Sequence, residues 1–169
     1  MTKISLFFGT TTGKTEGIAD LIVDEFNGIP ITSKDISKAS LDDLVAADVI
    51  IIGSPTWDIG QLQSDWESVY DDLDKLDFSG KKVAYFGTGD QYGYADNFMD
   101  AIGILEEKIS SRGGKTIGYW SIDGYEFNQS RAVRDNKFVG LAIDEDNQSE
   151  LTEKRVKSWV SQLKQELGL

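Results

Sequence analysis

Short apolar runs alternate with helical patterns of apolar residues along the whole chain. The runs without polar alternation are typical of parallel strands that are covered on both faces, whereas apolar residues three and four apart indicate amphipathic helices. The predicted strands are ISLFF at 4–8, IPIT near Ile31, DVIIIG at 48–53, KVAYFG at 82–87, and a last strand in two pieces, TIGYW at 116–120 and FVGLAI at 138–143.

Helical spacing is clearest in four stretches, at 18–26, 62–73, 98–109 and 156–167. A shorter helix is expected to begin at Ser40, because Asp43 follows three residues later in a capping-box spacing. The glycines at 113–114 and 168 are expected to end the last two long helices. Strand and helix alternate throughout, which predicts an α/β fold with a doubly wound parallel sheet and helices on both faces.

The segment SIDGYEFNQSRAVRDNK, about 121–137, interrupts this pattern because it is polar and has no clear period. We interpret it as a loop that splits the last strand, an insertion at about 120–138. A segment of this length in a compact domain is usually functional or a packed surface excursion. Its purpose stays open at this stage.

Composition restricts the chemistry and the partners. The 169 residues with 40% hydrophobic content are enough for one core, so we expect a single domain, 1–169. The chain has no cysteine and no histidine, which excludes disulfides, Ser-His-Asp and Cys-His hydrolases and most zinc enzymes, and fits a reducing compartment such as the cytoplasm.

The formal net charge is -12, so nucleic acid and anionic membranes are disfavoured as partners and a basic protein surface is favoured. No apolar run approaches the length of roughly 20 residues that spans a bilayer. The first residues lead directly into a predicted strand without a signal-peptide core. We therefore expect a soluble protein.

Three loops follow predicted strands and would meet at one edge of the sheet, where open α/β sheets bind ligands. They are GTTTGKT at 9–15, GSPTWDIG at 53–60 and GTGDQYGYADNF at 87–98. The first resembles a nucleotide triphosphate loop, but only three residues separate Gly9 from Gly13, whereas the Walker A pattern has four. The neighbouring strand also ends in Gly53-Ser54-Pro55-Thr56, without the acidic residue that a magnesium triphosphate requires there.

The first loop offers threonine hydroxyls and backbone N–H groups at a helix N-terminus, which suit a terminal phosphomonoester. A helix cap without a ligand is the alternative, and Lys14 could then point into water. Trp57 and Tyr94 lie in the other two loops and could stack on the two faces of a flat heterocycle, although either could be an ordinary surface aromatic. Trp66 and Trp159 lie in helical stripes and are predicted core residues, whereas Trp120 is undecided.

Taken together, the motifs T-x-T-G-x-T, P-T-W and G-T-G-D-x-x-G-Y-x-D-N-F resemble the flavodoxins, small electron-transfer proteins that contain flavin mononucleotide (FMN). The resemblance covers essentially the whole chain, and the insertion is similar to that of long-chain members, with cyanobacterial sequences the most alike. It implies a single-domain flavodoxin-like sheet of five parallel strands in the order 2-1-3-4-5.

The resemblance also implies a set of FMN-binding residues. Thr10, Thr11, Thr12, Gly13, Lys14 and Thr15 would hold the phosphate, and Trp57 and Tyr94 would flank the isoalloxazine ring. The pyrimidine edge and N5 would meet backbone groups of Gly89, Asp90 and the turn around Asp58 and Ile59. The remaining members, which would line the ribityl chain or support the loops, are Ser54, Pro55, Thr56, Gly60, Thr88, Asn97 and Asp146.

In the family, the carbonyl at the Asp58 position turns toward flavin N5 on one-electron reduction. A type I to type II flip would drive β-branched Ile59 to positive φ, so we expect only moderate stabilisation of the one-electron reduced form. Burial of the stacked ring among acidic residues is expected to make the second potential strongly negative.

The implied function is a low-potential one-electron carrier with no catalytic side chain and no resident metal, able to replace ferredoxin. The implied partners are ferredoxin-NADP reductase and photosystem I, which a monomer would meet through an acidic face. The candidate contact residues are the acids Asp58, Asp65, Glu67, Asp90, Asp96, Asp100, Glu126, Asp144 and Asp146.

Three other functions share some of these sequence features. A phosphotransferase or nucleotidase would rest on Gly13-Lys14-Thr15 and would bind a magnesium nucleotide. A quinone reductase would keep the flavin but oxidise NAD(P)H, usually as a tetramer. A response-regulator receiver is discarded, because Gly9-Thr10 and Ser54-Pro55 stand where it needs acids.

Overall fold

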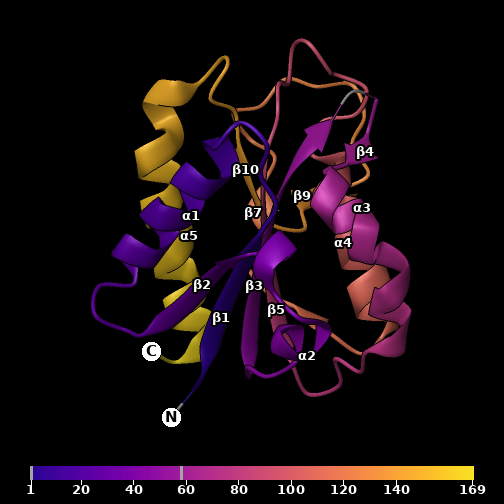
Figure 1. Cartoon of the computed structure of the whole chain (residues 1–169). Helices are drawn as coiled ribbons and strands as arrows, with labels where there is room; N and C mark the ends of the chain where they lie inside the picture. The colour runs from indigo at the N-terminus through magenta and orange to yellow at the C-terminus, as the bar shows by residue number, and fades with distance from the viewer. Residues whose placement is uncertain (1, 58) are drawn as a thin grey trace.

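The computed structural model describes residues 2–57 and 59–169, and its centre is a twisted parallel sheet (Figure 1). Five strands lie in the order β10-β5-β3-β1-β2. Every neighbouring pair on this path is parallel. The doubly wound fold with strand order 2-1-3-4-5 is therefore confirmed. The strands are β1 (Ile4–Phe8), β2 (Ile31–Asp35), β3 (Val49–Trp57), β5 (Lys82–Thr88) and β10 (Leu141–Ile143).

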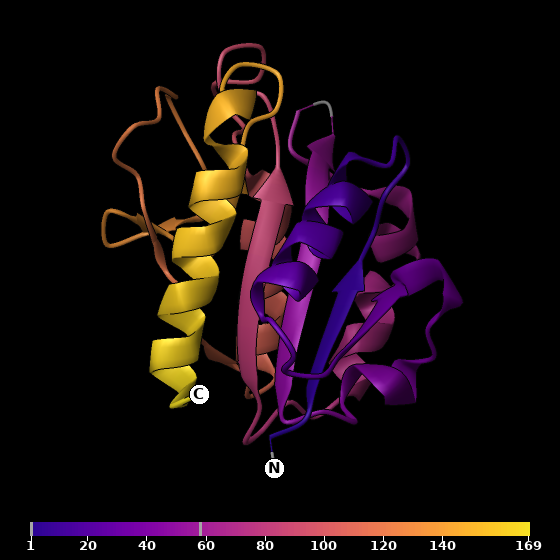
Figure 2. The same ribbon diagram turned by 90° about the vertical axis from the view of Figure 1, so that its left-hand side faces the viewer.

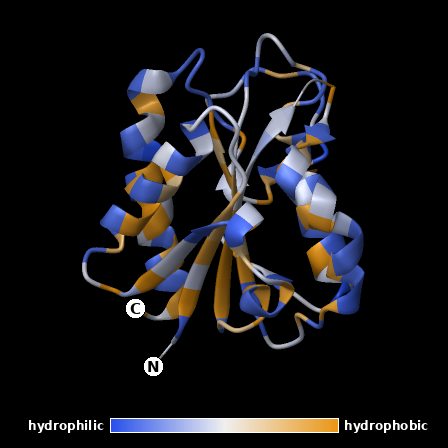
Figure 3. Cartoon of the chain, in the orientation of Figure 1, coloured by the Kyte–Doolittle hydropathy of each residue, from blue (hydrophilic) through white to orange (hydrophobic). Residues whose placement is uncertain are grey.

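Helices cover both faces of the sheet (Figures 1 and 2). On one face, α1 (Lys14–Glu25) packs beside α5 (Thr152–Leu167), and on the other lie α2 (Leu41–Leu44), α3 (Ser64–Tyr70) and α4 (Asp100–Ser111). Hydrophobic residues concentrate in the central strands (Figure 3). Because successive strand residues point to opposite faces, Leu6 joins the core under α1 and α5, whereas Phe7 joins the core under α3 and α4.

Local signals in the sequence account for several helix ends. Ser40 and Asp43 form the predicted capping box of α2, and α5 ends at Gly168, which has φ 71. After α4, Gly113 has φ 100, a conformation that favours glycine. Short 3-10 helices follow β2 at Ile36–Lys38, continue α3 at Asp71–Lys75, and precede α5 at Ser149–Leu151.

The predicted helix at 62–73 begins later than its apolar spacing suggested. Leu62 lies instead in β4 (Gln61–Leu62), which pairs antiparallel with the end of β3. The helix begins after Gln63, whose Oε1 accepts hydrogen bonds from the N–H groups of Asp65 and Trp66. This side chain caps the first turn, and so sets the start of the helix. Trp66 and Trp159 are fully buried, as predicted.

The last strand is split, but its pieces are shorter than predicted. β6 (Lys115–Thr116) pairs with the first half of β5, and β10 pairs with the second half. Trp120 and Phe138 leave the main sheet, so the prediction for these residues is wrong. The chain turns away at Gly118, with φ 78, and returns at Gly140, where a Cβ would lie 1.9 Å from the carbonyl oxygen of Tyr85.

The insertion is not simply a loop. It contains a small antiparallel sheet in the order β7-β9-β8, formed by β7 (Trp120–Ser121), β8 (Val133–Arg134) and β9 (Lys137–Phe138). Its aromatic side chains Tyr125, Phe127 and Phe138 surround Phe98, with ring centroids 5.2 to 5.8 Å apart. The insertion therefore packs against the segment that precedes α4. None of the helices in the described part of the chain is long and apolar enough to cross a membrane.

Candidate functional site

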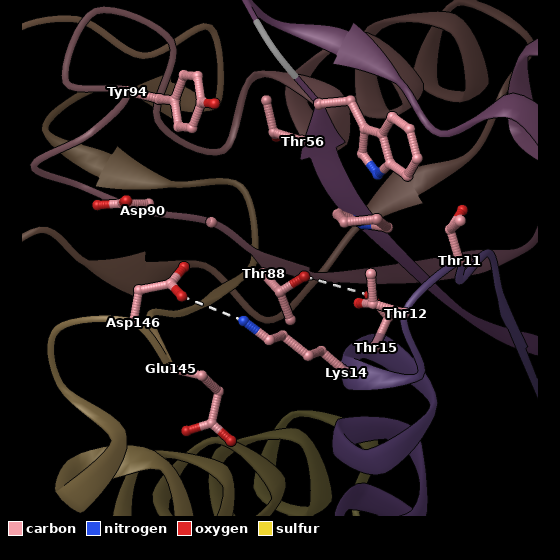
Figure 4. A pocket seen from close by; sticks show the side chains of 13 residues that line it. Thr11, Thr12, Lys14, Thr15, Thr56, Thr88, Asp90, Tyr94, Glu145 and Asp146 are labelled. Carbon is pink, nitrogen blue, oxygen red and sulfur yellow. Dashed lines mark hydrogen bonds and ion pairs between the residues drawn. The ribbon is translucent and has the colours of Figure 1, made fainter.

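One pocket lies at the carboxyl ends of the parallel strands, where all three predicted loops meet (Figure 4). Its walls come from the loops after β1, β3, β5 and β10, so residues far apart in sequence share it. The lining residues are Thr11, Thr12, Lys14, Thr15, Pro55, Thr56, Trp57, Thr88, Gly89, Asp90, Tyr94, Glu145 and Asp146.

The first loop wraps the N-terminus of α1. Gly13 caps the helix with φ 86, and its N–H donates to Thr10 Oγ1 at 3.0 Å. Thr10 and Gly13 therefore shape the loop without lining the pocket. Thr15 is buried, and its hydroxyl lies 3.2 Å from the hydroxyl of Thr88 on β5. The first turn of α1 thus presents hydroxyls and N–H groups to the pocket, an arrangement that favours a bound anion.

Lys14 crosses the mouth of this loop and does not point freely into water. Its Nζ lies 3.1 Å from Asp146 Oδ1 (Figure 4). Both side chains are about half exposed, at 53% and 48%, so the pair adds at most about 1 kcal/mol to stability. The ion pair joins the first loop to the loop after β10 and offsets the charge of the lysine.

Trp57 and Tyr94 enter the same pocket from two different loops. They are 37% and 46% exposed, which is high for aromatic side chains that line a cavity. The N–H of Tyr94 donates to the carbonyl of Asp90 at 3.0 Å, which fixes the start of the turn that carries the ring. Two exposed aromatics beside a polar helix N-terminus suit a ligand with a flat ring and an anionic group.

Asp90 orders the loop between β5 and α4. Its Oδ1 accepts hydrogen bonds from the N–H groups of Gly93 and Tyr92 and from Asn147 Nδ2. These bonds hold the pKa of Asp90 below its ordinary value, with the N–H of Gly93 having the largest effect, and the charge of Lys14 acts in the same direction. The carboxylate is therefore ionised at neutral pH.

Several predicted site residues lie around the pocket without lining it. Ser54 is fully buried and its hydroxyl donates to the carbonyl of Pro55, whereas Ile59 is 76% exposed. Gly60 has φ 90 and donates its N–H to the carbonyl of Trp57. Asn97 donates from Nδ2 to Asp100 Oδ2, and so supports the loop. Asp58 lies outside the described residues.

Thr56 serves both the pocket and the fold, because its hydroxyl accepts the N–H of Ala101 in the first turn of α4. Glu145 was missed by sequence reasoning, although it directly precedes the predicted Asp146 after the last strand. Its carboxylate accepts the hydroxyl of Thr152 at 2.7 Å. Two adjacent acids thus flank the pocket on the side of the loop after β10.

Two acids of the predicted contact set are not on the surface. Asp100 is 3% exposed and Asp144 is 0% exposed, so the prediction of a surface role for them is wrong. Backbone N–H groups bind both carboxylates, for example Arg131 N–H on Asp100 at 2.7 Å. Asp65 and Asp90 are half-buried, whereas Glu67, Asp96, Glu126 and Asp146 are exposed.

Comparison with known proteins identifies the family of this chain. A family model described as Flavodoxin matches residues 6–159, nearly the whole chain. The chain belongs to the flavodoxin family. Flavodoxins are electron-transfer proteins and not enzymes, which agrees with the expectation from the sequence motifs.

Individual relatives extend over the same length. A flavodoxin from a Nostoc species is 66% identical over 167 residues, covering 99% of this chain and 98% of the relative. One from Synechococcus elongatus is 64% identical over 170 residues, covering 100% of each. Among solved structures, Fusobacterium nucleatum flavodoxin bound to flavin mononucleotide superposes with a TM-score of 0.94 at 31% identity, covering 98% of this chain and 99% of that one.

Proposed function

We propose that residues 1–169 form one FMN-binding domain that carries electrons one at a time between redox proteins. The observation that carries this proposal is the pocket itself, in which a hydroxyl-lined helix N-terminus and two exposed aromatic side chains share one cavity. A phosphate and a flat ring on one ligand would fill these two regions. The family membership and the FMN bound by the Fusobacterium nucleatum relative agree with it.

The phosphate end of the pocket has few fixed positive charges, which fits a phosphomonoester. Thr11, Thr12 and Thr15 supply hydroxyls, and the start of α1 supplies N–H groups and the positive end of the helix dipole. Lys14 is already paired with Asp146, so donors of hydrogen bonds rather than a free cation would hold the phosphate. Thr10 and Gly13 would keep the loop in its turn.

The ring end would lie between Trp57 and Tyr94, with Gly89 and Asp90 at its edge. Stacking on aromatic rings adds about 0.5 to 1.5 kcal/mol per pair beyond the burial of apolar surface. Pro55, Thr56 and Thr88 would line the middle of the pocket, where the ribityl chain belongs. Ser54, Ile59, Gly60 and Asn97 would then support these loops.

Bound FMN would supply the redox chemistry, and the side chains of this chain set its binding and its electrostatic environment. Asp90, Glu145 and Asp146 place carboxylates beside the pocket, and only Asp146 has an ion-pair partner among the residues that the structure describes. Negative charge near the flavin disfavours the uptake of electrons. This arrangement supports a low reduction potential.

The partner surface would be acidic. The chain carries a net charge of -12, and Glu67, Asp96, Glu126 and Asp146 are exposed. Opposite charge on a partner steers association and speeds encounter. We assign ferredoxin-NADP reductase and photosystem I as partners, with the chain as a cytoplasmic monomer that can replace ferredoxin, and cyanobacterial relatives support this assignment.

The binding proposal is tested by titrating flavin-free protein with FMN, riboflavin and magnesium ATP while following flavin fluorescence or nucleotide binding. Tight binding of FMN, with weaker binding of riboflavin and no binding of magnesium ATP, supports it. Binding of magnesium ATP instead would favour the phosphotransferase alternative. A high rate of NAD(P)H oxidation by the loaded protein, with elution as a tetramer, would favour a quinone reductase.

The partner proposal is tested by measuring the rate of electron transfer to ferredoxin-NADP reductase over a range of salt concentrations. Steering between opposite charges predicts that the rate constant for association falls as ionic strength rises. A rate that does not change with salt would remove the acidic face from the proposal while leaving FMN binding intact.

A further inference from the structure

Asp144 is a buried carboxylate immediately after β10, and it does not line the pocket. It is 0% exposed and accepts five hydrogen bonds. Oδ1 accepts the N–H groups of Asp146 and Asn147 at 3.1 and 3.0 Å. Oδ2 accepts Gln91 N–H at 3.1 Å, Gln91 Nε2 at 2.7 Å and Asn147 Nδ2 at 2.9 Å.

These bonds join the loop after β10 to the loop after β5, and the two loops form opposite ends of the pocket. On one side, Asp146 donates its N–H to Asp144 while its own carboxylate pairs with Lys14 at the first loop. On the other side, Gln91 lies in the loop that carries Tyr94. The phosphate end and the ring end of the pocket therefore meet at one carboxylate.

A second bridge runs through Asn147. Its Nδ2 donates to Asp144 Oδ2 and also lies 2.7 Å from Asp90 Oδ1. Asp90 in turn accepts the N–H of Tyr94 on its carbonyl. A short chain of hydrogen bonds thus leads from the buried carboxylate to the backbone of the exposed aromatic residue.

The charge on Asp144 is held by neutral donors, since the described residues place no cation in an ion pair with it. A buried carboxylate is costly unless its oxygens are fully hydrogen-bonded, and charged acceptors form shorter and stronger bonds than neutral ones. All five donors here come from the two loops, so the carboxylate holds the loops to each other.

We propose that Asp144 is a positioning residue for FMN binding, which fixes the Tyr94 loop relative to the Lys14–Asp146 ion pair before the ligand arrives. This inference rests on the proposed function, because FMN is the ligand whose two ends the loops would hold. Pre-organised loops bind more tightly because less conformational freedom is lost on association.

The direct test is Asp144→Asn, which keeps the shape of the side chain. In either orientation its NH₂ group would face N–H donors, at Oδ1 or at Oδ2. Two donors lose their acceptor if the NH₂ group stands at Oδ1, and three if it stands at Oδ2. Bonds to a charged acceptor are strong, so the loops should lose much of their pre-organisation, and we expect FMN binding to weaken by at least about tenfold. The dissociation constant is measured by flavin fluorescence at a temperature where circular dichroism shows the flavin-free variant to be folded.

Glu150→Gln is the matched control. It removes the same charge from an exposed position in the following 3-10 helix, where the Glu150 side chain makes no hydrogen bond with the described residues. We expect its FMN affinity to stay within about twofold of the unmodified protein, since surface changes away from the site have small effects. A comparable loss in both variants would make net charge, and not position, the cause.

Two further measurements separate positioning from general stability. In Asp144→Asn, the backbone amides of Gln91 and Asp146 should exchange hydrogen faster, and the visible circular dichroism of bound FMN should change. If the variant does not fold, Asn147→Ala keeps the Asp144 carboxylate and four of its five hydrogen bonds, and it removes the side-chain bonds from Asn147 to Asp144 and to Asp90. It should weaken FMN binding by about threefold or more.

The outcomes are distinct. A lower melting temperature of the flavin-free variant, with unchanged FMN affinity and an unchanged flavin spectrum, would overturn the positioning role and leave a purely structural one. Failure of the unmodified protein to bind FMN would instead refute the proposed function, and this inference with it.

Discussion

Thr15→Val is the substitution that most directly tests how the first loop would hold a phosphate. Thr15 is 1% exposed, lines the pocket, and has its hydroxyl 3.2 Å from that of Thr88. Valine has nearly the same shape, so the packing of α1 against the sheet should be kept. The substitution removes one hydroxyl that faces the site of the proposed phosphate.

The expected loss follows from the charge of the ligand. A hydrogen bond to a charged group contributes about 1.5 to 3 kcal/mol, which corresponds to roughly 10- to 150-fold in a dissociation constant. We therefore expect FMN binding to weaken by roughly 10- to 150-fold, while riboflavin binding, which involves no phosphate, changes by less than about threefold. Both constants are measured by fluorescence titration of flavin-free protein.

Thr116→Val is the control, since its hydroxyl donates to Glu106 far from the pocket. It should leave both ligands unaffected. If Thr15→Val weakened riboflavin as much as FMN, the hydroxyl would act on the fold or on the ring, and the assignment of the first loop to the phosphate would be wrong. An unchanged affinity for FMN would have the same consequence.

Three predictions concern the scaffold. Gly17→Ala in the exposed part of α1 should stabilise the flavin-free protein by about 0.5 to 1 kcal/mol in urea unfolding, because a Cβ there meets nothing within 4 Å and alanine has the higher helix propensity. A loss of stability would contradict this prediction. Gly140→Ala should lower the free energy of unfolding by at least about 2 kcal/mol in the same assay, because its Cβ would lie 1.9 Å from the Tyr85 carbonyl oxygen. A neutral result would mean that the chain before β10 moves away from β5 easily. The pKa of Asp90 is lowered in the folded state, so its contribution to stability is present above pH 3.8 and is lost as the pH falls through the folded-state value. In Asp90→Asn, the free energy of unfolding should therefore depend less on pH at acid pH than in the unmodified protein. The same pH dependence in both proteins would refute the assignment.

The main elements could be predicted because their signals are local. ISLFF is apolar at every position except Ser5, and it became β1 with the predicted bounds. The capping box at Ser40 needs only four residues to be recognised. The two-residue strands of the insertion could not be predicted, because periodicity needs at least four residues to be visible. In addition, β7 pairs with β9 across most of the insertion, although β8 and β9 are close in sequence.

The pocket was predictable as a set of loops, since the strand order brings their ends together. What could not be predicted is how each side chain is held. In the sequence, Asp144 cannot be told from a surface acid, because one of its hydrogen-bond donors, Gln91, is 53 residues away. In the same way, the partner of Lys14 lies 132 residues further along the chain, so the sequence alone left the lysine undecided.

The most direct test of the central claim is the absorption spectrum of the FMN-loaded protein during stepwise anaerobic reduction. The account predicts two flavin bands in the oxidised protein and a reduction in two separate one-electron steps, with a distinct spectrum between them. A protein that stays colourless after incubation with FMN, or a bound flavin that takes up both electrons in a single step, would contradict it.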